Sequence, residues 1–386
     1  MLVSRRIYWP SINLIGPGCV KEVGAEAAKL GLKKALLVTD KVLVQAGVAG
    51  KVMESLTAAG VPYVVFDEVQ PNPTMKNVND ALALLKKEGC DFLVSVGGGS
   101  PQDAASAVSI LATNGGDVRD YEGIAKSSRR GLPVVAVNTT AGTAAEVTVN
   151  YVITDEERKI KMVMVDPNSL AVVAVNDPAL MIGKPAGLTA ATGMDALTHA
   201  IEAYVTRGAY ELSDHIAYKA IELIGANLRD AVKDGSDLKA RSGMAWGSFV
   251  AGLSFSNCGL GIVHSMAHQL GSEYDLPHGV ANAILLPYVM EFNREVCVAK
   301  FARIALALGK NVTGKTPEEA SLMAVEAVKE LSRDVCIPAL RETAFSPKDV
   351  DKLAAQALRD VCTGGNPKDV TVDDLKALYL KAYEGA

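Results

Sequence analysis

The sequence predicts an α/β domain followed by an all-α domain, and three observations support this prediction. In the first half, short apolar runs alternate with amphipathic stretches of helical spacing. From about Ala186 onward the pattern becomes a succession of helices. A chain of 386 residues also exceeds one ordinary core. We therefore expect a doubly wound, Rossmann-like domain over residues 1–182 and an all-helical domain over residues 183–386.

The first domain is expected to contain a parallel sheet. Apolar runs predict strands at 35–39, 62–66, 92–96, 133–137, 151–154 and 170–175. Amphipathic stretches at 48–59 and 76–88 predict helices between strands. Strands that alternate with helices at this spacing indicate βαβ units, whose strands run parallel.

The second domain is expected to follow a break in the pattern near Pro178 to Pro185. Helical periodicity then predicts helices at 192–205, 211–226, 239–254, 260–271, 279–292, 296–308, 317–332, 348–358 and 372–383.

Composition argues against several classes of protein. The net charge is −5 and no basic stripe is present, so nucleic acid is not an expected partner. No apolar run reaches the length of a transmembrane helix, and the N-terminus lacks the apolar segment of a signal peptide. Six scattered cysteines without a CxxC pair suggest neither a zinc knuckle nor a disulfide framework. A cytosolic protein without membrane contact is expected.

A histidine pattern in the second domain predicts a metal site. Asp195 and His199 are four residues apart, as are His264 and His268, and His278 follows in LPHGVAN. A spacing of four places two side chains on one face of a helix. Two such pairs and one loop histidine can converge on a divalent ion such as Fe(II) or Zn(II).

A different interpretation of Asp195 is a helix cap, with Thr192 as N-cap and Asp195 three residues later. The surroundings favour the metal. Residues 242–293 contain three histidines and neither Lys nor Arg, and residues 188–206 also lack both cations. Histidines in such an uncharged, apolar setting are typical of a functional site.

Two turns of the first domain are candidates for phosphate binding. Gly97-Gly98-Gly99-Ser100 follows the predicted strand 92–96, and glycines there let a phosphate approach a helix N-terminus. Ser100 could instead be the N-cap, with Asp103 completing a capping box. The turn 138–143 follows the strand 133–137 at the same edge, where open α/β sheets bind ligands.

Asp40, at the end of the predicted strand 35–39, bears on the choice of nucleotide. An acid there can accept hydrogen bonds from a ribose and would repel a 2′-phosphate, which favours NAD over NADP. Asp40 could equally be the cap of the next helix.

Together these motifs resemble the iron-containing (group III) alcohol dehydrogenase family, which shares its two-domain plan with dehydroquinate synthase. The resemblance runs end to end through GGGSPQD, TTAGTAAEVTVNYVITDEE, AATGMDALTHAIEAY, GLGIVHSMAHQLG and PHGVANAILLPYVM. The likeness is greatest to members that interconvert lactaldehyde and 1,2-propanediol, through GTAAEVTVNYVIT, SFSNCGLG and DVCTGGNP.

The resemblance implies an oxidoreductase with NAD(H) and Fe(II), or occasionally Zn(II), in a homodimer. The implied metal ligands are Asp195, His199, His264 and His278, with His268 as a catalytic proton relay. The implied cofactor contacts are Asp40, Asn72, Gly98, Gly99, Ser100, Thr139, Thr140, Thr143 and Lys161. The implied walls of the substrate pocket are Asn150, Val152, Phe255, Leu260 and Cys362.

Two departures from the family pattern stand out. Many members have Lys at the position of Ser106, so the help that this Lys gives to the cofactor is in question. Many members also read GTGSE where this chain has GTAAE at 142–146, a variant that matches the lactaldehyde-reducing type.

The absence of cations from residues 242–293 predicts an uncharged substrate, a small alcohol, diol or aldehyde. The alternatives within the family are ethanol, 1,3-propanediol and methanol. A more distant alternative is a metal- and NAD-dependent lyase of the dehydroquinate synthase type, which would need a basic pocket for its phosphorylated carboxylate. A metal- or nucleotide-binding protein without catalytic activity is a third class.

Overall fold

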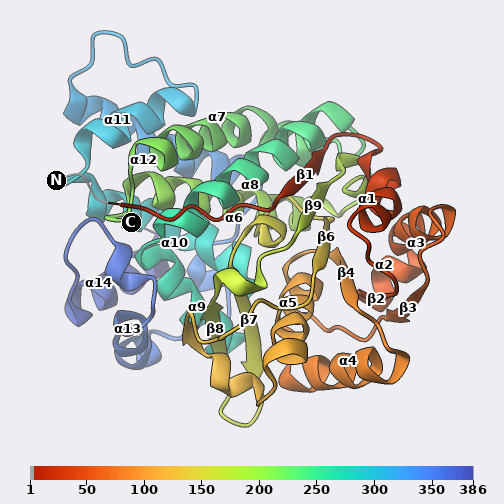
Figure 1. Ribbon diagram of the computed structural model, residues 1–386. Coiled ribbons are helices and arrows are strands. Elements are labelled where there is room, and N and C mark those ends of the chain that lie inside the picture. The colour runs from red at the N-terminus through yellow and green to blue at the C-terminus, as the bar shows by residue number, and fades with distance from the viewer. Residues whose placement is uncertain (1–3, 386) are drawn as a thin grey trace. The chain divides into compact units, whose positions relative to one another are not determined.

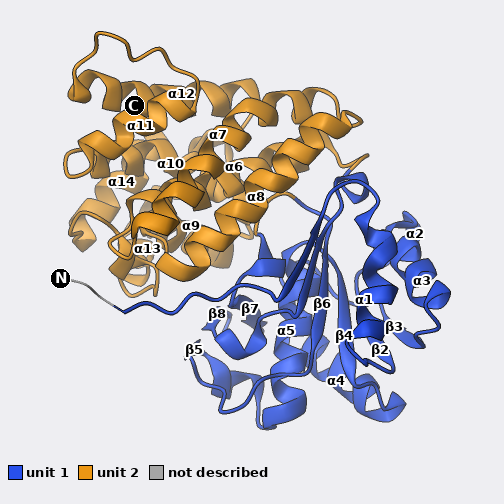
Figure 2. Cartoon of the chain, turned by 45° about the horizontal axis from the view of Figure 1, so that its top comes forward, with its two compact units in different colours: residues 1–140, 144–181 blue, residues 141–143, 182–386 orange. Residues whose placement is uncertain are grey.

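The computed structural model describes residues 4–385, which form two compact units (Figure 2). The first unit contains the chain up to Thr140 and Ala144–Met181. The second contains Ala141–Thr143 and the chain from Ile182 onward. The first is an α/β unit and the second is helical, so the predicted fold class is confirmed.

The first unit is built on a six-stranded sheet with the strand order β1-β9-β6-β4-β2-β3, all parallel (Figure 1). The strands are β1 (Ile12–Ile15), β2 (Ala35–Val38), β3 (Tyr63–Phe66), β4 (Phe92–Gly97), β6 (Val134–Asn138) and β9 (Val173–Asn176). The helices are α1 (Val23–Lys29), α2 (Lys41–Gln45), α3 (Val48–Ala58), α4 (Met75–Glu88) and α5 (Gly99–Asn114). The strand β1 was not predicted from the sequence.

Alternate residues of the strands β2, β3, β4 and β6 face two separate hydrophobic clusters. Leu37 and Val94 pack with α1 and α3 on one face of the sheet. Leu36 and Leu93 pack with α4 and α5 on the other. Both faces are therefore covered, which explains why the strands are continuous apolar runs in the sequence.

The run 151–154 is a strand, but its predicted place in the parallel sheet is wrong. The strand β7 (Asn150–Asp155) pairs antiparallel with β8 (Ile160–Val165), which also pairs with the short β5 (Gly123–Ile124). The connection between β7 and β8 is too short for a parallel crossover, so the two strands form a hairpin. The strand β8 was missed, although Met162–Val165 forms a short apolar run in the sequence.

A buried carboxylate stabilises this hairpin. Asp155 accepts hydrogen bonds from Arg119 Nε at 2.6 Å and from Arg158 Nε at 2.6 Å. It also accepts from the backbone N–H groups of Glu157 and Arg158. Hydrogen bonding from Arg119 and Arg158 holds the pKa of Asp155 well below its usual range, although burial opposes the shift.

The second unit contains helices at all the predicted places. They are α6 (Ala186–Val205), α7 (Glu211–Lys233), α8 (Leu238–Cys258), α9 (Ile262–Tyr274), α10 (His278–Arg294), α11 (Val298–Ala307), α12 (Pro317–Asp334), α13 (Val350–Leu358) and α14 (Val372–Glu384). Helix α6 is buried along most of its length and packs against α7, α8 and α10. It therefore places its polar side chains in the interior of the unit.

Helix α6 begins six residues before the predicted start, at Ala186 instead of position 192. Thr192 therefore lies inside the helix, where its hydroxyl donates to the carbonyl of Leu188 at 2.9 Å. The capping interpretation of Thr192 and Asp195 is wrong, because Pro185 holds the N-cap position. Asp195 is a buried carboxylate in mid-helix.

Within the described residues, no single helix is long and apolar enough to cross a membrane. Helices α8 and α9 meet that length and composition only as a pair, with a bend of 102° between them.

Candidate active site

Helix α6 presents three polar side chains on one buried face. Asp195, His199 and Glu202 follow one another at spacings of four and three, so they lie one above another along the helix. All three are almost fully buried. Glu202 was not singled out from the sequence, although its spacing from His199 was a usable signal.

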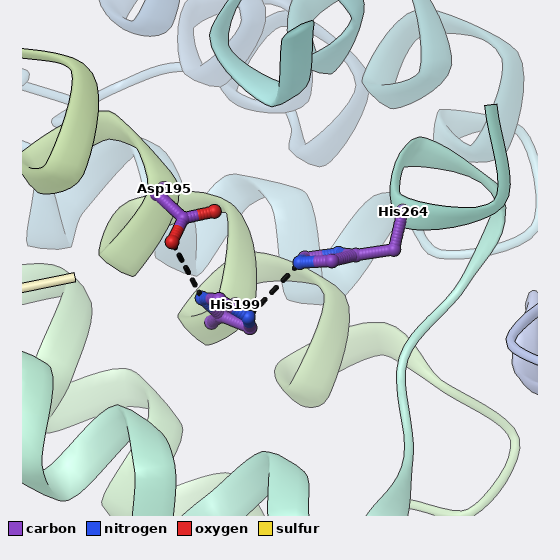
Figure 3. A group of neighbouring side chains, drawn as sticks. All are labelled: Asp195, His199 and His264. Atoms are coloured by element: carbon purple, nitrogen blue, oxygen red, sulfur yellow. Dashed lines mark hydrogen bonds and ion pairs between the residues drawn. The ribbon is translucent and has the colours of Figure 1, made fainter. Parts of the chain in front are cut away.

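Helix α9 brings His264 to this face, as Figure 3 shows. The Nε2 atoms of His199 and His264 are 2.9 Å apart, and Asp195 Oδ2 lies 3.7 Å from His199 Nδ1. Asp195, His199 and His264 each offer a ligand atom, and these atoms lie within 4.8 Å of one another.

His278, the first residue of α10, completes the group of predicted ligands. Its Nε2 atom lies 3.6 Å from Asp195 Oδ1, and its ring centroid lies 5.4 Å from that of His264. The structure therefore brings all four predicted ligands together at one place in the second unit.

Two imidazoles of this group, those of His199 and His264, favour the neutral form. Burial lowers the pKa of His264 well below its ordinary value, and repulsion from His199, His278 and His268 lowers it further. Burial also lowers the pKa of His199, with partial opposition from Asp195. Metals bind the neutral imidazole, so these shifts prepare both rings for coordination.

Glu202 sets the orientation of the His264 ring. Its Oε2 atom lies 2.6 Å from His264 Nδ1, and its Oε1 atom accepts from the Val263 N–H at 2.7 Å. When Nδ1 donates to the carboxylate, Nε2 is left unprotonated and faces His199. Burial raises the pKa of Glu202 to about 8.

The side chains present fit a divalent cation. Two ring nitrogens at 2.9 Å cannot both direct lone pairs at each other unless a proton or a cation lies between them. Nitrogens that are each about 2.1 Å from Fe(II) or Zn(II) lie roughly 3 Å apart, close to the observed separation. Three imidazoles and one carboxylate are also a donor set that these ions accept.

Asn282 lies among the ligand atoms and was missed in the sequence. Its amide nitrogen is 2.7 Å from Asp195 Oδ1, 3.2 Å from His264 Nε2 and 3.1 Å from His278 Nε2. Asn282 is fully buried and follows His278 by four residues on α10. That spacing, already used for the histidine pairs, could have revealed it.

His268 lies beside the group of ligands. Its ring stacks on that of His278 with centroids 5.4 Å apart and an interplanar angle of 15°. Its Nδ1 atom lies 2.8 Å from Asp360 Oδ2. Asp360 was also missed, because 92 residues separate it from His268 and only the fold brings them together.

Two predicted pocket residues lie next to these histidines. The ring of Phe255 stacks on His199 with centroids 4.2 Å apart. Cys362 lies within 4.8 Å of ligand atoms of His268 and Asp360. Burial, with Asp360 and Glu202 nearby, raises the pKa of the Cys362 thiol well above its ordinary value, so it is suited to packing and poorly suited to metal binding or nucleophilic attack.

The remaining pocket residues are more dispersed. Leu260 is buried just before α9, where its carbonyl accepts from the Thr206 hydroxyl at 3.1 Å. Asn150 and Val152 lie in the first unit, two residues apart on β7 and therefore on one face of that strand.

The first predicted phosphate-binding turn lies beside residues 138–140 of the second in the first unit. The Thr139 N–H donates to the Gly97 carbonyl at 3.0 Å, and β4 pairs with β6 just before both turns. A Cβ at Gly98 would lie 3.0 Å from the Thr140 side chain, so the close approach favours glycine. Gly98 is the N-cap of α5, so the interpretation of Ser100 as N-cap is wrong.

The other predicted cofactor residues have these positions. Asp40 is the N-cap of α2 and accepts from the Leu43 N–H at 2.8 Å, so its capping interpretation is confirmed. Asn72 Oδ1 accepts from Lys161 Nζ at 2.9 Å. Thr143 lies in the short segment that groups with the second unit. Ser106 lies within α5.

Comparisons with known proteins cover nearly the whole chain. The family model described as "Iron-containing alcohol dehydrogenase" matches residues 10–178, and the model described as "Fe-containing alcohol dehydrogenase family, C-terminal" matches residues 189–383. Lactaldehyde reductase of Escherichia coli K12 is 49% identical over 99% of this chain and 100% of its own length. 1,3-Propanediol dehydrogenase of Klebsiella pneumoniae is 47% identical over 97% of each chain.

Solved structures give the same result. A crystal structure of 1,3-propanediol oxidoreductase has a TM-score of 0.97 and 47% identity, covering 98% of this chain and 100% of that one. Sulfoacetaldehyde reductase of Bifidobacterium kashiwanohense, solved in complex with NAD⁺, has a TM-score of 0.90 and 27% identity over the full length of both chains.

Proposed function

The chain belongs to the iron-containing alcohol dehydrogenase family, and we propose that it interconverts a small uncharged alcohol or diol and its aldehyde, with NAD(H) and Fe(II) as cofactors. The family was predicted from the sequence motifs, and that prediction is confirmed. The observation that most supports the proposed chemistry is the convergence of ligand atoms from Asp195, His199 and His264 within 4.8 Å. The lyase alternative loses support, because the relatives described above are oxidoreductases.

In this proposal the second unit binds the metal and transfers the proton of the substrate hydroxyl to water. Asp195, His199, His264 and His278 hold the ion, and Glu202 and Asn282 orient them. When bound, the ion would supply a Lewis acid that lowers the pKa of the substrate hydroxyl, and NAD⁺ would supply the hydride acceptor. His268 accepts the hydroxyl proton and passes it to water, since its side chain is 18% exposed.

The first unit is proposed to bind NAD(H). The N–H groups at the start of α5 and the hydroxyls of the neighbouring threonine turn suit a pyrophosphate. These residues are Gly98, Gly99, Ser100, Thr139, Thr140 and, on the adjoining segment, Thr143. Asp40 would accept a hydrogen bond from a ribose hydroxyl. Lys161, whose Nζ donates a hydrogen bond to Asn72 Oδ1, would contribute a positive charge.

For the substrate we propose lactaldehyde and 1,2-propanediol. In this proposal Phe255 and Cys362, which lie beside the histidines, are apolar walls of a pocket for a small uncharged molecule. 1,3-Propanediol is the second candidate, since the relative that acts on it is 47% identical, against 49% for lactaldehyde reductase.

The test is a reconstitution without oxygen. The protein is stripped with a chelator, Fe(II) or Zn(II) is added back, and NADH oxidation is followed with lactaldehyde and with 3-hydroxypropanal. Restoration by Fe(II) with a higher kcat/KM for lactaldehyde is expected. Preference for 3-hydroxypropanal would select the second substrate, and failure with simple aldehydes despite bound metal would contradict the proposed function.

We also propose a cytosolic homodimer. All six cysteines are free thiols, as suits a reducing compartment. Light scattering on the purified protein would give twice the chain mass of 40.5 kDa for a dimer, and a single chain mass would contradict it.

A further inference from the structure

The proton relay His268 has a carboxylate partner that the family resemblance did not identify. Asp360 Oδ2 lies 2.8 Å from His268 Nδ1, and Asp360 Oδ1 accepts from the Cys362 N–H at 2.9 Å. The Asp360 side chain is 9% exposed and that of His268 is 18% exposed. The pair is therefore mostly buried, and a small part of each side chain is exposed to solvent.

The turn that carries Asp360 is fastened to the helix that carries His268. The Thr363 N–H donates to the Asp360 carbonyl at 3.1 Å, and the Thr363 hydroxyl donates to Ser265 Oγ at 2.7 Å. Ser265 precedes His268 by three residues on α9, so the Thr363–Ser265 hydrogen bond and the Asp360–His268 contact lie about one helical turn apart. The carboxylate and the ring are thus both fixed relative to α9.

The charge state of Asp360 decides which ring nitrogen carries the proton. Burial raises the pKa of Asp360, but attraction to His268 and hydrogen bonds from His268 and Cys362 outweigh it, and the pKa lies below its ordinary value. An ionised carboxylate can only accept hydrogen bonds, so Nδ1 of His268 must donate. Nε2 of the neutral ring is then the unprotonated nitrogen.

We propose that Asp360 is a positioning residue that holds His268 in the Nδ1–H tautomer and so leaves Nε2 available for the substrate's hydroxyl proton. This inference rests on the proposed function, in which His268 exchanges that proton with solvent. The bond from the substrate oxygen to hydrogen breaks, the bond from Nε2 to hydrogen forms, and water then removes the proton. Asp360 accepts the Nδ1–H bond throughout and takes up no proton itself.

The experiment uses Asp360→Ala, Asp360→Glu, His268→Ala and the double variant Asp360→Ala with His268→Ala. The matched control is Asp349→Asn. Asp349 Oδ2 accepts from the Tyr274 hydroxyl at 2.6 Å, so it also binds α9 through a carboxylate but does not contact His268. Metal content is measured in every variant and is expected to equal that of the wild type.

The first readout is the tautomer of His268 and needs no turnover. The full chain is loaded with diamagnetic Zn(II) and labelled with ¹⁵N at its five histidines, and His268→Ala assigns the resonances. Wild type, Asp360→Glu and Asp349→Asn should show a protonated Nδ1 and an unprotonated Nε2. In Asp360→Ala the proton should move to Nε2 or be shared. An unchanged tautomer in Asp360→Ala would overturn the proposal.

The second readout is the single-turnover rate of NADH formation from 1,2-propanediol. Asp360→Ala should lower it roughly 10- to 100-fold, with less than about a twofold change in the half-saturating alcohol concentration. The double variant should be no slower than His268→Ala, because Asp360 acts through His268. Multiplied losses in the double variant would overturn the proposal, whereas absence of turnover in the wild type would contradict the proposed function instead.

Discussion

Replacement of Glu202 by Gln tests how the protein prepares His264 for a metal. Gln has nearly the same shape, so its carbonyl oxygen can keep the hydrogen bond from the Val263 N–H, which is 2.7 Å in the wild type. The other end then presents an NH₂ group at 2.6 Å from His264 Nδ1, where the carboxylate was an acceptor. Nδ1 can no longer donate, so the ring is driven toward the Nε2–H tautomer, which cannot bind a metal through Nε2.

The size of the effect follows from what is lost and what is kept. One charge-assisted hydrogen bond to a metal-binding ring disappears, and such partners are worth about 10- to 100-fold in metal affinity. This corresponds to roughly 1.4 to 2.7 kcal/mol. The stripped protein should keep most of its stability, because Gln has nearly the shape of Glu and keeps the hydrogen bond from the Val263 N–H, and because burial, which raises the pKa of Glu202 to about 8, opposes a charge at this position.

The assay is competition with a metal-binding dye for Zn(II) and, without oxygen, for Fe(II). Glu146→Gln is the matched control, since Glu146 is a buried acid whose Oε1 accepts from Asn176 and which lies in the other unit. Glu202→Gln should weaken binding by the stated factor, and the control should not. A dissociation constant within twofold of the wild type for a folded Glu202→Gln variant would refute the reasoning.

Three further variants test the fold around these sites. Asp155→Asn should lower the melting temperature most at neutral pH. The difference from the wild type should shrink below about pH 4, because a carboxylate with a lowered pKa loses its stabilising effect as it is protonated. Thermal melts at pH 7 and pH 3 measure this difference, and an equal difference at both pH values would contradict the prediction. Burial raises the pKa of Glu146 to about 7, so its ionisation costs stability as pH rises from about 4.5 through 7. Glu146→Gln should therefore stabilise the protein at pH 8, by at most roughly 3 kcal/mol, and not at pH 4.5; urea titrations at both pH values measure the difference, and equal gains would refute it. A Cβ at Gly279 would lie 2.3 Å from the Ala191 carbonyl, so Gly279→Ala should push His278 away from α6. Zn(II) binding, measured with the same dye, should weaken at least tenfold. Unchanged binding would contradict this prediction, because α10 would then shift without moving the ligand.

Local spacing explains why a metal site at Asp195 and His199 could be predicted from the sequence, whereas the choice of His278 over His268 as a ligand was implied by the family resemblance. Asp195 and His199 share one helix, and any helix that contains both must place them on one face. The parallel strands were equally accessible, because both faces of the sheet are buried and each central strand is an apolar run. These signals lie within a few residues of one another, so no knowledge of the tertiary structure was needed.

Features that depend on distant pairing were not accessible in this way. Asp360 is 92 residues from His268 in the chain, and only the fold brings the two side chains together. The start of α6 was misplaced for a local reason, because the Thr192 side chain suits an N-cap whereas Pro185 holds that position.

The two histidines of α9 each have a carboxylate partner at Nδ1 but are proposed to have different roles. His264 bonds its Nδ1 to Glu202 and His268 bonds its Nδ1 to Asp360, so each ring is left with Nε2 as its free nitrogen. What separates them is their surroundings. The His264 side chain is 2% exposed and faces another ring nitrogen, whereas that of His268 is 18% exposed and can reach water. A nitrogen closed off from water can hold a cation without losing it to solvent, and a nitrogen in contact with water can release a proton. The division of labour between ligand and base therefore follows the different exposure of the two rings.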